Sequence, residues 1–347
     1  MKSYVIEKKR IGFLLEEFLK NFKVYGPTKP GFDSSFDEIK SMDDLNLDYK
    51  STVIPPKKFF LPPREILFEF KTENKKFEIK EIINQEKFVL FGVHPCDVNA
   101  IIKLDRFFSD DIKDTYYHNR RKNSIIVALN CVHPDEYSFC KSMNAGPFLD
   151  KGYDILLTDI GRKYLIEIGS NKGKKIIKGI KIAEASYNDI NKKEKKCISA
   201  DKKIKKIIDP SWLPKLAEEN LDYKIWIDLA ERGGVNGCFS CLSCGSCSLV
   251  CPTCYCYDVY DKLDLSLKKG IRIRELDSCQ LLEYGEAALD FNFRKERRDR
   301  IRHWMNCKFG AAAGGNNSSC VGCGRCILIC PAKIDITKVA KSLWSKR

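Results

Sequence analysis

The sequence predicts an α+β protein, in which an N-terminal part of mixed α/β structure precedes a helical part rich in cysteine. Three observations favour this class. Short β-branched segments alternate with helix-like segments over the first half of the chain. A lysine-rich stretch then separates this half from the rest. Most of the 17 cysteines of the 347-residue chain lie beyond that stretch, in closely spaced runs.

The first half supplies one helix and four strands. Residues 11–22 have apolar side chains at helical intervals. Four apolar segments bounded by turn residues are strand candidates: 88–93, 124–131, 154–160 and 163–169. We assign residues 1–187 to this N-terminal α/β domain. Residues 188–235 form a connection, with a surface segment over 188–206 and a helix over 212–232. Residues 236–347 form the cysteine-rich domain.

Five cysteines lie within residues 238–252, in CFSCLSCGSCSLVCP. Starting from Cys241, the spacing is C-x2-C-x2-C-x3-C-P, which is the bacterial ferredoxin pattern for binding iron–sulfur clusters. Starting from Cys238 would put Ser248 in the fourth position. Only one register therefore works, and Cys238 is left over.

The same spacing returns near the C-terminus in CVGCGRCILICP, residues 320–331. Zinc ribbons use two C-x2-C pairs instead, so two identical copies favour two [4Fe–4S] clusters over zinc or disulfides. In two-cluster ferredoxins the fourth cysteine of each motif reaches the other cluster. The first cluster is therefore expected on Cys241, Cys244, Cys247 and Cys330, and the second on Cys320, Cys323, Cys326 and Cys251. Together they make this part a dicluster ferredoxin-like domain with a long insert, residues 258–316.

Further cysteines fall into two groups and favour a third cluster. Four lie after the first motif or in the insert: Cys254, Cys256, Cys279 and Cys307. Three follow or end strand candidates: Cys96, Cys131 and Cys140. The first group ranks higher because it offers four thiolates, the soft ligands that iron prefers. For each of these cysteines taken singly, the alternative is a small buried side chain that binds no metal. His94 and His133 could supply a fourth ligand, although we expect surface histidines. The sequence gives no role for Cys197.

Composition excludes several classes of function. The net charge is +14, but the lysines are scattered and lack interleaved aromatics, which speaks against nucleic-acid binding. A basic surface could instead steer an acidic redox partner. The sequence shows no apolar run long enough for a membrane span and no signal peptide, so we expect a cytoplasmic protein with reduced cysteines. No G-x-G-x-x-G, P-loop or H-E-x-x-H motif occurs.

Several segments are similar to one known family. They are TVIPPKKFFLPPREILFEF, FGVHPCDVNAIIKLDRFF, CPTCYCYDVYD, LDSCQ and NFRKERRDRIRH. They resemble the iron–sulfur beta subunit of soluble [NiFe] hydrogenase/sulfur reductase (sulfhydrogenase), a family that includes the A subunit of anaerobic sulfite reductase. The resemblance runs from about residue 24 to 336. The PPKKFF segment and the cysteine of HWMNCKF favour the sulfhydrogenase branch.

The resemblance implies a subunit that relays single electrons and has no catalytic residue of its own. Its partners would be a flavoprotein subunit that binds NAD(P)H and a hydrogenase or sulfite reductase catalytic subunit. Family members carry a Cys-x-Cys pair where this chain has Ser138-Phe139-Cys140. This departure weakens the case for Cys96, Cys131 and Cys140 as ligands. Two other roles stay open, namely direct reduction of a sulfur substrate at a third cluster and clusters that only hold the fold.

Overall fold

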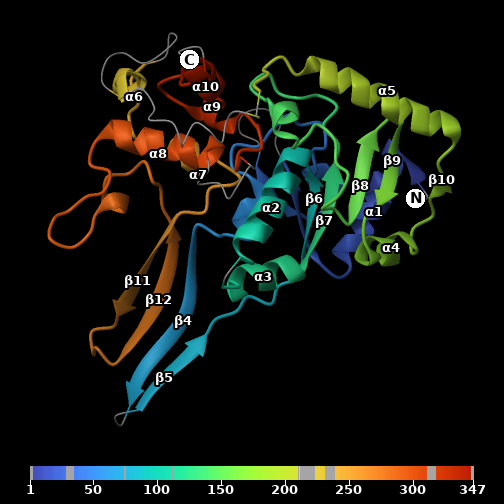
Figure 1. Ribbon diagram of the computed structural model, residues 1–347. Coiled ribbons are helices and arrows are strands. Elements are labelled where there is room, and N and C mark those ends of the chain that lie inside the picture. Colours follow the sequence, from blue (N-terminus) through green and yellow to red (C-terminus); the bar gives the residue numbers. More distant parts are fainter. Residues whose placement is uncertain are drawn as a thin grey trace.

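The computed structural model describes residues 3–28, 35–73, 76–110, 112–209, 211, 223–230, 239–310 and 318–344. Figure 1 shows its helices and strands. In chain order they are β1 (Ser3–Glu7), α1 (Ile11–Leu19), β2 (Lys23–Pro27), β3 (Phe36–Ile39), β4 (Arg64–Glu73), β5 (Lys76–Glu81), β6 (Phe88–Val93), α2 (Pro95–Phe107), α3 (Thr115–Lys122), β7 (Ser124–Leu129), β8 (Ile155–Asp159), β9 (Lys163–Ile168), α4 (Asn171–Ile177), β10 (Ala183–Glu184), α5 (Tyr187–Lys203), α6 (Tyr223–Ala230), α7 (Ser246–Leu249), β11 (Tyr257–Leu263), β12 (Lys269–Leu276), α8 (Arg297–Phe309), α9 (Arg325–Ile329) and α10 (Ile336–Trp344).

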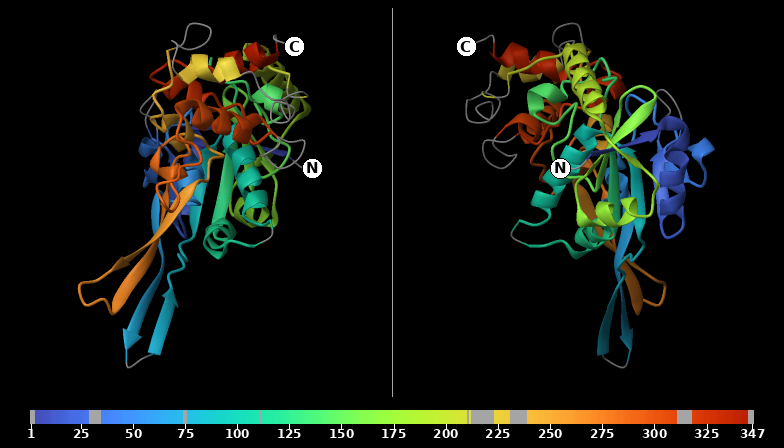
Figure 2. Two further views of the ribbon diagram at one scale, coloured as in Figure 1. Left: turned by 60° about the vertical axis from the view of Figure 1, so that its left-hand side comes forward. Right: turned by 90° about the vertical axis from the view of Figure 1, so that its right-hand side faces the viewer.

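An eight-stranded mixed sheet forms the centre of the N-terminal half. Its strand order is β10-β1-β9-β8-β7-β6-β2-β3. Strands β2, β6, β7 and β8 are parallel neighbours, and the remaining pairs are antiparallel. Helices α2 and α3 lie on one face and α1 on the other (Figure 2). The prediction of a mixed α/β N-terminal half is therefore confirmed.

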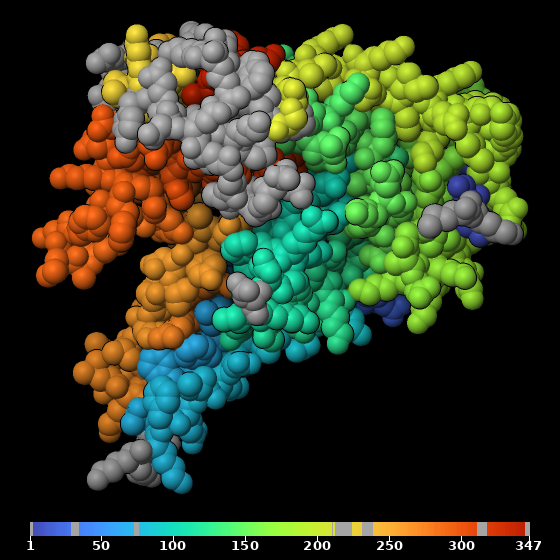
Figure 3. Space-filling view, viewed as in Figure 1, coloured from blue at the N-terminus to red at the C-terminus, as the bar shows by residue number. Residues whose placement is uncertain are grey.

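A second sheet has four antiparallel strands in the order β11-β12-β4-β5. It projects from the body as an arm (Figures 1 and 3). The arm joins two hairpins that are far apart in sequence, because β11 and β12 come from the insert between the two cysteine motifs. At its base, the buried Glu65 carboxylate pairs with Arg120 and with Arg274, whose Nη2 lies 2.5 Å from Glu65 Oε1.

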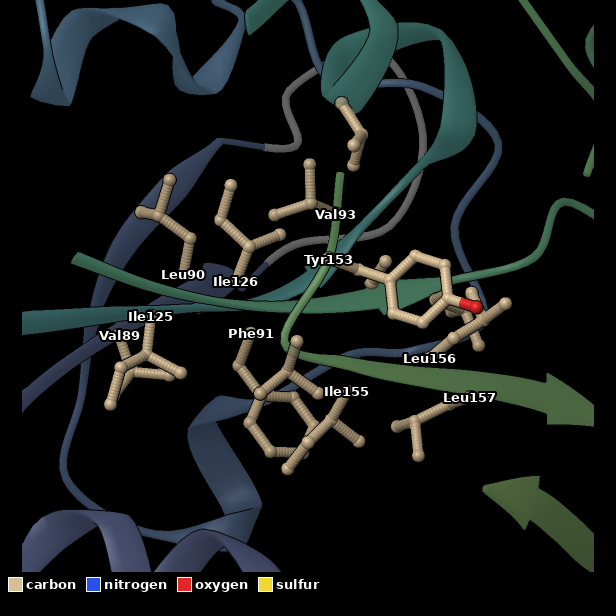
Figure 4. Packing of buried hydrophobic residues seen from close by; sticks show 14 of the residues in the cluster. Val89, Leu90, Phe91, Val93, Ile125, Ile126, Tyr153, Ile155, Leu156 and Leu157 are labelled. Carbon is tan, nitrogen blue, oxygen red and sulfur yellow. The ribbon is translucent and has the colours of Figure 1, made fainter. Parts of the chain in front are cut away.

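The main hydrophobic core lies between the eight-stranded sheet and its helices. The central strands β6 and β7 are buried along their whole length, as parallel strands covered on both faces are. Figure 4 shows the side chains of β6, β7 and β8 packed together. Phe18 of α1 meets Phe91 of β6 edge to face, with ring centroids 6.1 Å apart. The four strands expected from their apolar sequences all form, within one or two residues of the predicted ends.

Two expectations about the middle of the chain need correction or restriction. Residues 188–206 were expected to be a surface connection, but most of them form helix α5. The Ser186 hydroxyl accepts the backbone N–H of Asp189 while the Asp189 carboxylate accepts the Ser186 N–H, a capping box that favours the helix despite its polar composition. Of the helix expected over 212–232, residues 223–230 form α6. Residues 212–222 and 231–232 lie outside the described residues.

Candidate metal centres

The two cysteine motifs adopt the same local structure, a loop followed by a short helix. Loop 1 (residues 241–251) includes the short helix α7, and loop 2 (residues 320–330) includes α9. The residue before each helix is a glycine in the left-handed region, Gly245 with φ 76° and Gly324 with φ 81°. Glycine adopts this conformation without the steric cost of a Cβ. Helices α7 and α9 contact each other, which brings the two loops together.

Two cavities lie between the loops, and each is lined by cysteines from both motifs. One cavity is lined by Cys241, Cys244, Cys247 and Cys330, together with Cys326 and apolar side chains such as Ile301 and Trp304. The other is lined by Cys251, Cys320, Cys323 and Cys326. We call these cysteine sets 1 and 2, with Cys326 in set 2. The fourth cysteine of each motif thus lies with the first three of the other.

The electrostatic neighbours of the thiols follow the same grouping. Burial raises the pKa of Cys247, and the thiols of Cys241 and Cys330 raise it further. Burial also raises the pKa of Cys320 to about 12, with contributions from Cys251 and Cys323. Thiols crowded together in this way are costly to ionise unless a positively charged group binds among them.

Backbone N–H groups point at three of these sulfurs. The N–H of Ser243 donates to Cys241 Sγ (3.3 Å), that of Gly322 to Cys320 Sγ (3.3 Å), and that of Ile334 to Cys330 Sγ (3.4 Å). Such bonds stabilise thiolates and tune iron–sulfur clusters. Four thiols around each cavity, with N–H donors to their sulfurs, are a donor set that fits a [4Fe–4S] cluster.

The cysteines of the described ranges do not form disulfides or a site for a single metal ion. All 16 cysteines in the described ranges are free thiols. Within those ranges, no three His, Cys, Asp or Glu side chains converge in a way that could hold one metal ion. Cys238 lies outside the described residues.

The four cysteines of the first leftover group lie beside sets 1 and 2. Cys256 interacts with Cys279, which lowers the pKa of Cys256 to about 6. Cys307 is a neighbour of both Cys256 and Cys279. Cys254 lies instead against Cys251 of set 2, because their side chains interact directly. The structure therefore groups three of the four closely and places the fourth toward set 2.

Two buried lysines flank this group, and no local sequence pattern signals their role. Lys57 Nζ donates to the carbonyl oxygen of Cys254 (2.8 Å). Lys308 Nζ lies 3.3 Å from Thr253 Oγ1 and 3.4 Å from its carbonyl oxygen. Burial alone would lower the pKa of Lys308, but the thiols of Cys251, Cys254 and Cys307 raise it well above its usual value. The Lys308 ammonium therefore favours thiolates around it, whereas burial lowers the pKa of Lys57.

The N-terminal group of cysteines lies at the carboxyl ends of the parallel strands β6 and β7. Cys96 follows β6 in the first turn of α2, and Cys131 follows β7. Burial raises the pKa of Cys96 and of Cys131, and the thiol of Cys140 raises both further. Burial also raises the pKa of Cys140 to about 12, with a further contribution from Cys323 of set 2. The three cysteines are therefore neighbours beside loop 2. The Ser138 hydroxyl donates to the carbonyl oxygen of Asp135 (2.6 Å).

The two histidines near these cysteines differ. His133 is exposed, as expected, with its Nδ1 3.3 Å from Lys203 Nζ. The surface expectation is wrong for His94, which is buried and stacks on Tyr49 with ring centroids 4.0 Å apart. Burial lowers the pKa of His94 to about 3, and the positive charge of Arg325 adds to the effect.

Loop 2 is held against the N-terminal half by close packing and by one ion pair. A Cβ on Gly322 would lie 2.7 Å from the backbone of Cys140, and the N–H of Phe139 donates to Gly322 O (2.8 Å). The guanidinium of Arg325 makes two hydrogen bonds to the Asp97 carboxylate of α2 and one to Thr52 O (2.6 Å). Sequence reasoning missed this pair, since a single arginine within a motif reveals no partner.

Comparison with known proteins supports the cysteine pattern and extends beyond it. The profile of the 4Fe-4S dicluster domain matches residues 240–334. The chain is 39% identical over 324 residues to the sulfhydrogenase 2 subunit beta of Pyrococcus furiosus, covering 91% of each protein. No solved structure matches the chain. None of the helices in the described ranges has the length and hydropathy that a membrane span requires.

Proposed function

Because this chain belongs to the family of the sulfhydrogenase beta subunits, we propose that it is the subunit that relays single electrons within a hydrogenase/sulfur reductase complex. The observation that carries the proposal is the crossed arrangement of the two cysteine sets. Each set joins three cysteines of one loop with the last cysteine of the other. This arrangement suits two clusters held close together, as a relay requires.

The residues of the chain would hold, position and shield the clusters. Sets 1 and 2 would each bind one [4Fe–4S] cluster, which supplies reversible one-electron chemistry when bound. Trp304 and Ile336 line both cavities and exclude water from them. The N–H groups of Ser243, Gly322 and Ile334 stabilise negative charge on the sulfurs. No residue is needed as an acid, base or nucleophile.

The proposed partners are a flavoprotein subunit that binds NAD(P)H and a catalytic subunit, with electrons passing between them through this chain. The similarity to a sulfhydrogenase subunit beta supports a catalytic subunit of the sulfhydrogenase kind. A catalytic subunit of the anaerobic sulfite reductase kind is the alternative. A chain with this many thiols suits a reducing compartment, so we place the complex in the cytoplasm.

A third cluster is part of the proposal, with two groups of cysteines as candidates. Cys256, Cys279 and Cys307 are mutual neighbours, and the buried Lys308 beside them favours thiolates. Cys96 and Cys131 each neighbour Cys140, beside Cys323. The first group keeps the higher rank because its three mutual neighbours have the Lys308 ammonium beside them, while Cys254 lies toward set 2.

The test is to purify the chain anaerobically, determine its metals and titrate it against potential. At least about eight irons per chain are expected, and about twelve with a third cluster. Electron paramagnetic resonance should show clusters that are reduced and reoxidised reversibly. A preparation that holds zinc and little iron would refute the proposal, and irreversible reduction would favour a structural role. Reduction of polysulfide by the isolated chain, with a viologen as donor, would show that it is catalytic itself.

A further inference from the structure

The two loops have the same cysteine spacing but very different exposure. Leu242 follows the first cysteine of loop 1, and 61% of its surface is exposed. Val321, at the same place in loop 2, is 2% exposed. Cys244 is the one exposed cysteine among the described residues, whereas its counterpart Cys323 is partly buried.

The contacts of loop 2 explain the difference. The N-terminal half covers loop 2, through the backbone of residues 137–140 and through the ion pair of Arg325 with Asp97. In loop 1 the position of Arg325 is taken by Ser246. Set 2 therefore lies on the inside of the molecule, and set 1 reaches the surface at loop 1.

Apolar side chains are exposed in loop 1 and just before it. Phe239, just before loop 1, is 64% exposed, and Leu249 of α7 is 47% exposed. Phe239 is fixed in place, since its N–H donates to Ala332 O (2.9 Å) on the chain that follows loop 2. Several exposed apolar side chains within one short segment are typical of contact sites between proteins.

Basic side chains lie at the start of helix α8, which packs against loop 1, and they outnumber the exposed carboxylate of Glu296 between them. Helix α8 packs against set 1, where its Ile301 and Trp304 line the cavity. Arg297, in the first turn of α8, is exposed and donates from Nη1 to Cys241 O of loop 1 (3.1 Å). Lys295 is exposed just before the helix. We define the loop-1 face as Phe239, Leu242, Cys244, Leu249, Lys295 and Arg297.

We propose that the loop-1 face is the docking surface for an acidic redox protein, which exchanges electrons with the chain at set 1. The inference rests on the proposed function and adds the place and the charge of the partner. Lysine and arginine beside an apolar centre attract a partner that carries carboxylates around an apolar patch of its own. The net charge of +14 adds long-range attraction to such a partner. A second copy of this chain would bring the same positive charges to the contact and be repelled.

The test measures binding of an acidic bacterial [4Fe–4S] ferredoxin to the holo-chain by calorimetry, with both proteins oxidised. In the patch variant, Lys295→Glu and Arg297→Glu are combined. In the control variant, Lys262→Glu and Lys269→Glu make the same change of net charge on exposed residues of the arm. The patch variant should bind at least about tenfold more weakly at low salt, and the control should stay within about twofold of the wild type. About 300 mM salt should weaken wild-type binding and remove the difference.

A further variant and a basic protein complete the test. Leu242→Glu should weaken binding at both salt concentrations, because it places a charge in the apolar centre. The proposal is overturned if the wild type does not bind the ferredoxin, if the patch and control variants weaken equally, or if basic cytochrome c binds more tightly. A chain that dimerises, and that Leu242→Glu makes monomeric, would assign the face to a second copy instead.

Iron content and viologen reduction of every variant separate this inference from the proposed function. If the wild type is not reduced reversibly, the proposed function fails whatever the binding shows. If reduction is normal in all variants and the patch variant binds like the wild type, only the docking surface is refuted.

Discussion

Arg325 and Asp97 form a buried ion pair between loop 2 and the N-terminal half of the chain. Arg325 Nη1 lies 2.6 Å from Asp97 Oδ1, and Nη2 lies 2.7 Å from Oδ2. Their side chains are 3% and 1% exposed, so neither charge has water as an alternative partner. Removing one partner of such a pair costs more than removing both.

We therefore expect Arg325→Met to lower the free energy of unfolding by about 3–5 kcal/mol, because it leaves the Asp97 carboxylate buried without a cation. The double variant Arg325→Met/Asp97→Leu should recover much of this loss. Anaerobic urea unfolding of the holo-chain measures both. The matched control is Arg272→Met, which breaks an exposed pair with Asp261 on the arm and should cost less than about 1 kcal/mol. An Arg325→Met chain as stable as the control would contradict the prediction.

The crossed cysteine sets predict which variants share a spectrum. Cys330→Ala should disturb the same electron paramagnetic resonance signal as Cys247→Ala, although its neighbour in the motif is Cys326. Cys251→Ala should in turn match Cys320→Ala. Cys197→Ala, a partly buried cysteine on α5, should leave iron content and spectrum unchanged. If Cys330→Ala matches Cys326→Ala instead, each motif holds its own cluster.

The two cysteine groups proposed for a third cluster differ in which variant should lose iron. Replacing Cys279 and Cys307 by alanine should remove about four irons and leave the signals of sets 1 and 2 in place, since neither residue lines their cavities. Cys254 is kept in this test because it lies against Cys251. Unchanged iron in that variant, combined with a loss in Cys96→Ala, would move the cluster to the N-terminal group.

Tyr117 predicts how stability depends on alkaline pH. Its side chain is fully buried and its hydroxyl donates to Asp105 Oδ1 (2.7 Å). Burial raises the pKa of Tyr117 well above 10, and the Asp105 carboxylate raises it further. The unfolded chain therefore loses the proton first as the pH rises above 10, and the folded state is destabilised by about 1.4 kcal/mol per pH unit. Below pH 10 both states keep the proton, and the contribution is constant.

Tyr117→Phe should make this alkaline slope shallower by that amount. At pH 8 it should cost only about 1 kcal/mol, because Asp105 keeps its bond from Arg121 Nε (3.0 Å). Thermal unfolding at pH 8 and at pH 10.5 provides the comparison. Equal slopes in the two proteins would show that Tyr117 does not stay protonated in the folded state.

Local patterns predicted much of the fold and of the site. The strands β6 and β7 were predictable because both faces are buried, which requires continuous apolar runs. The grouping of the cysteine sets was predictable because the ferredoxin spacing already implies crossing. Helix α5 was missed because its lysines and asparagines resemble a loop, although Ser186 and Asp189 are a capping signal.

Long-range relationships could not be predicted in the same way. The pairing of β4 with β12 joins segments about two hundred residues apart, and neither sequence identifies the other. The same holds for Asp97 and Arg325, and for the burial of His94 under the chain around Tyr49. These contacts depend on the three-dimensional arrangement, in which side chains meet whose local sequences carry no sign of each other.

The two-hairpin arm has a consequence for synthesis on the ribosome. The hairpin β4–β5 emerges first, with Phe77 and Ile79 exposed even in the finished arm. Its partner strand β12 is translated only some ten to forty seconds later, at ordinary rates of elongation. During that interval the nascent chain displays an unpaired β4 edge, which is open to wrong pairing with other chains. A chaperone that binds extended apolar segments would be most useful to this protein in that interval.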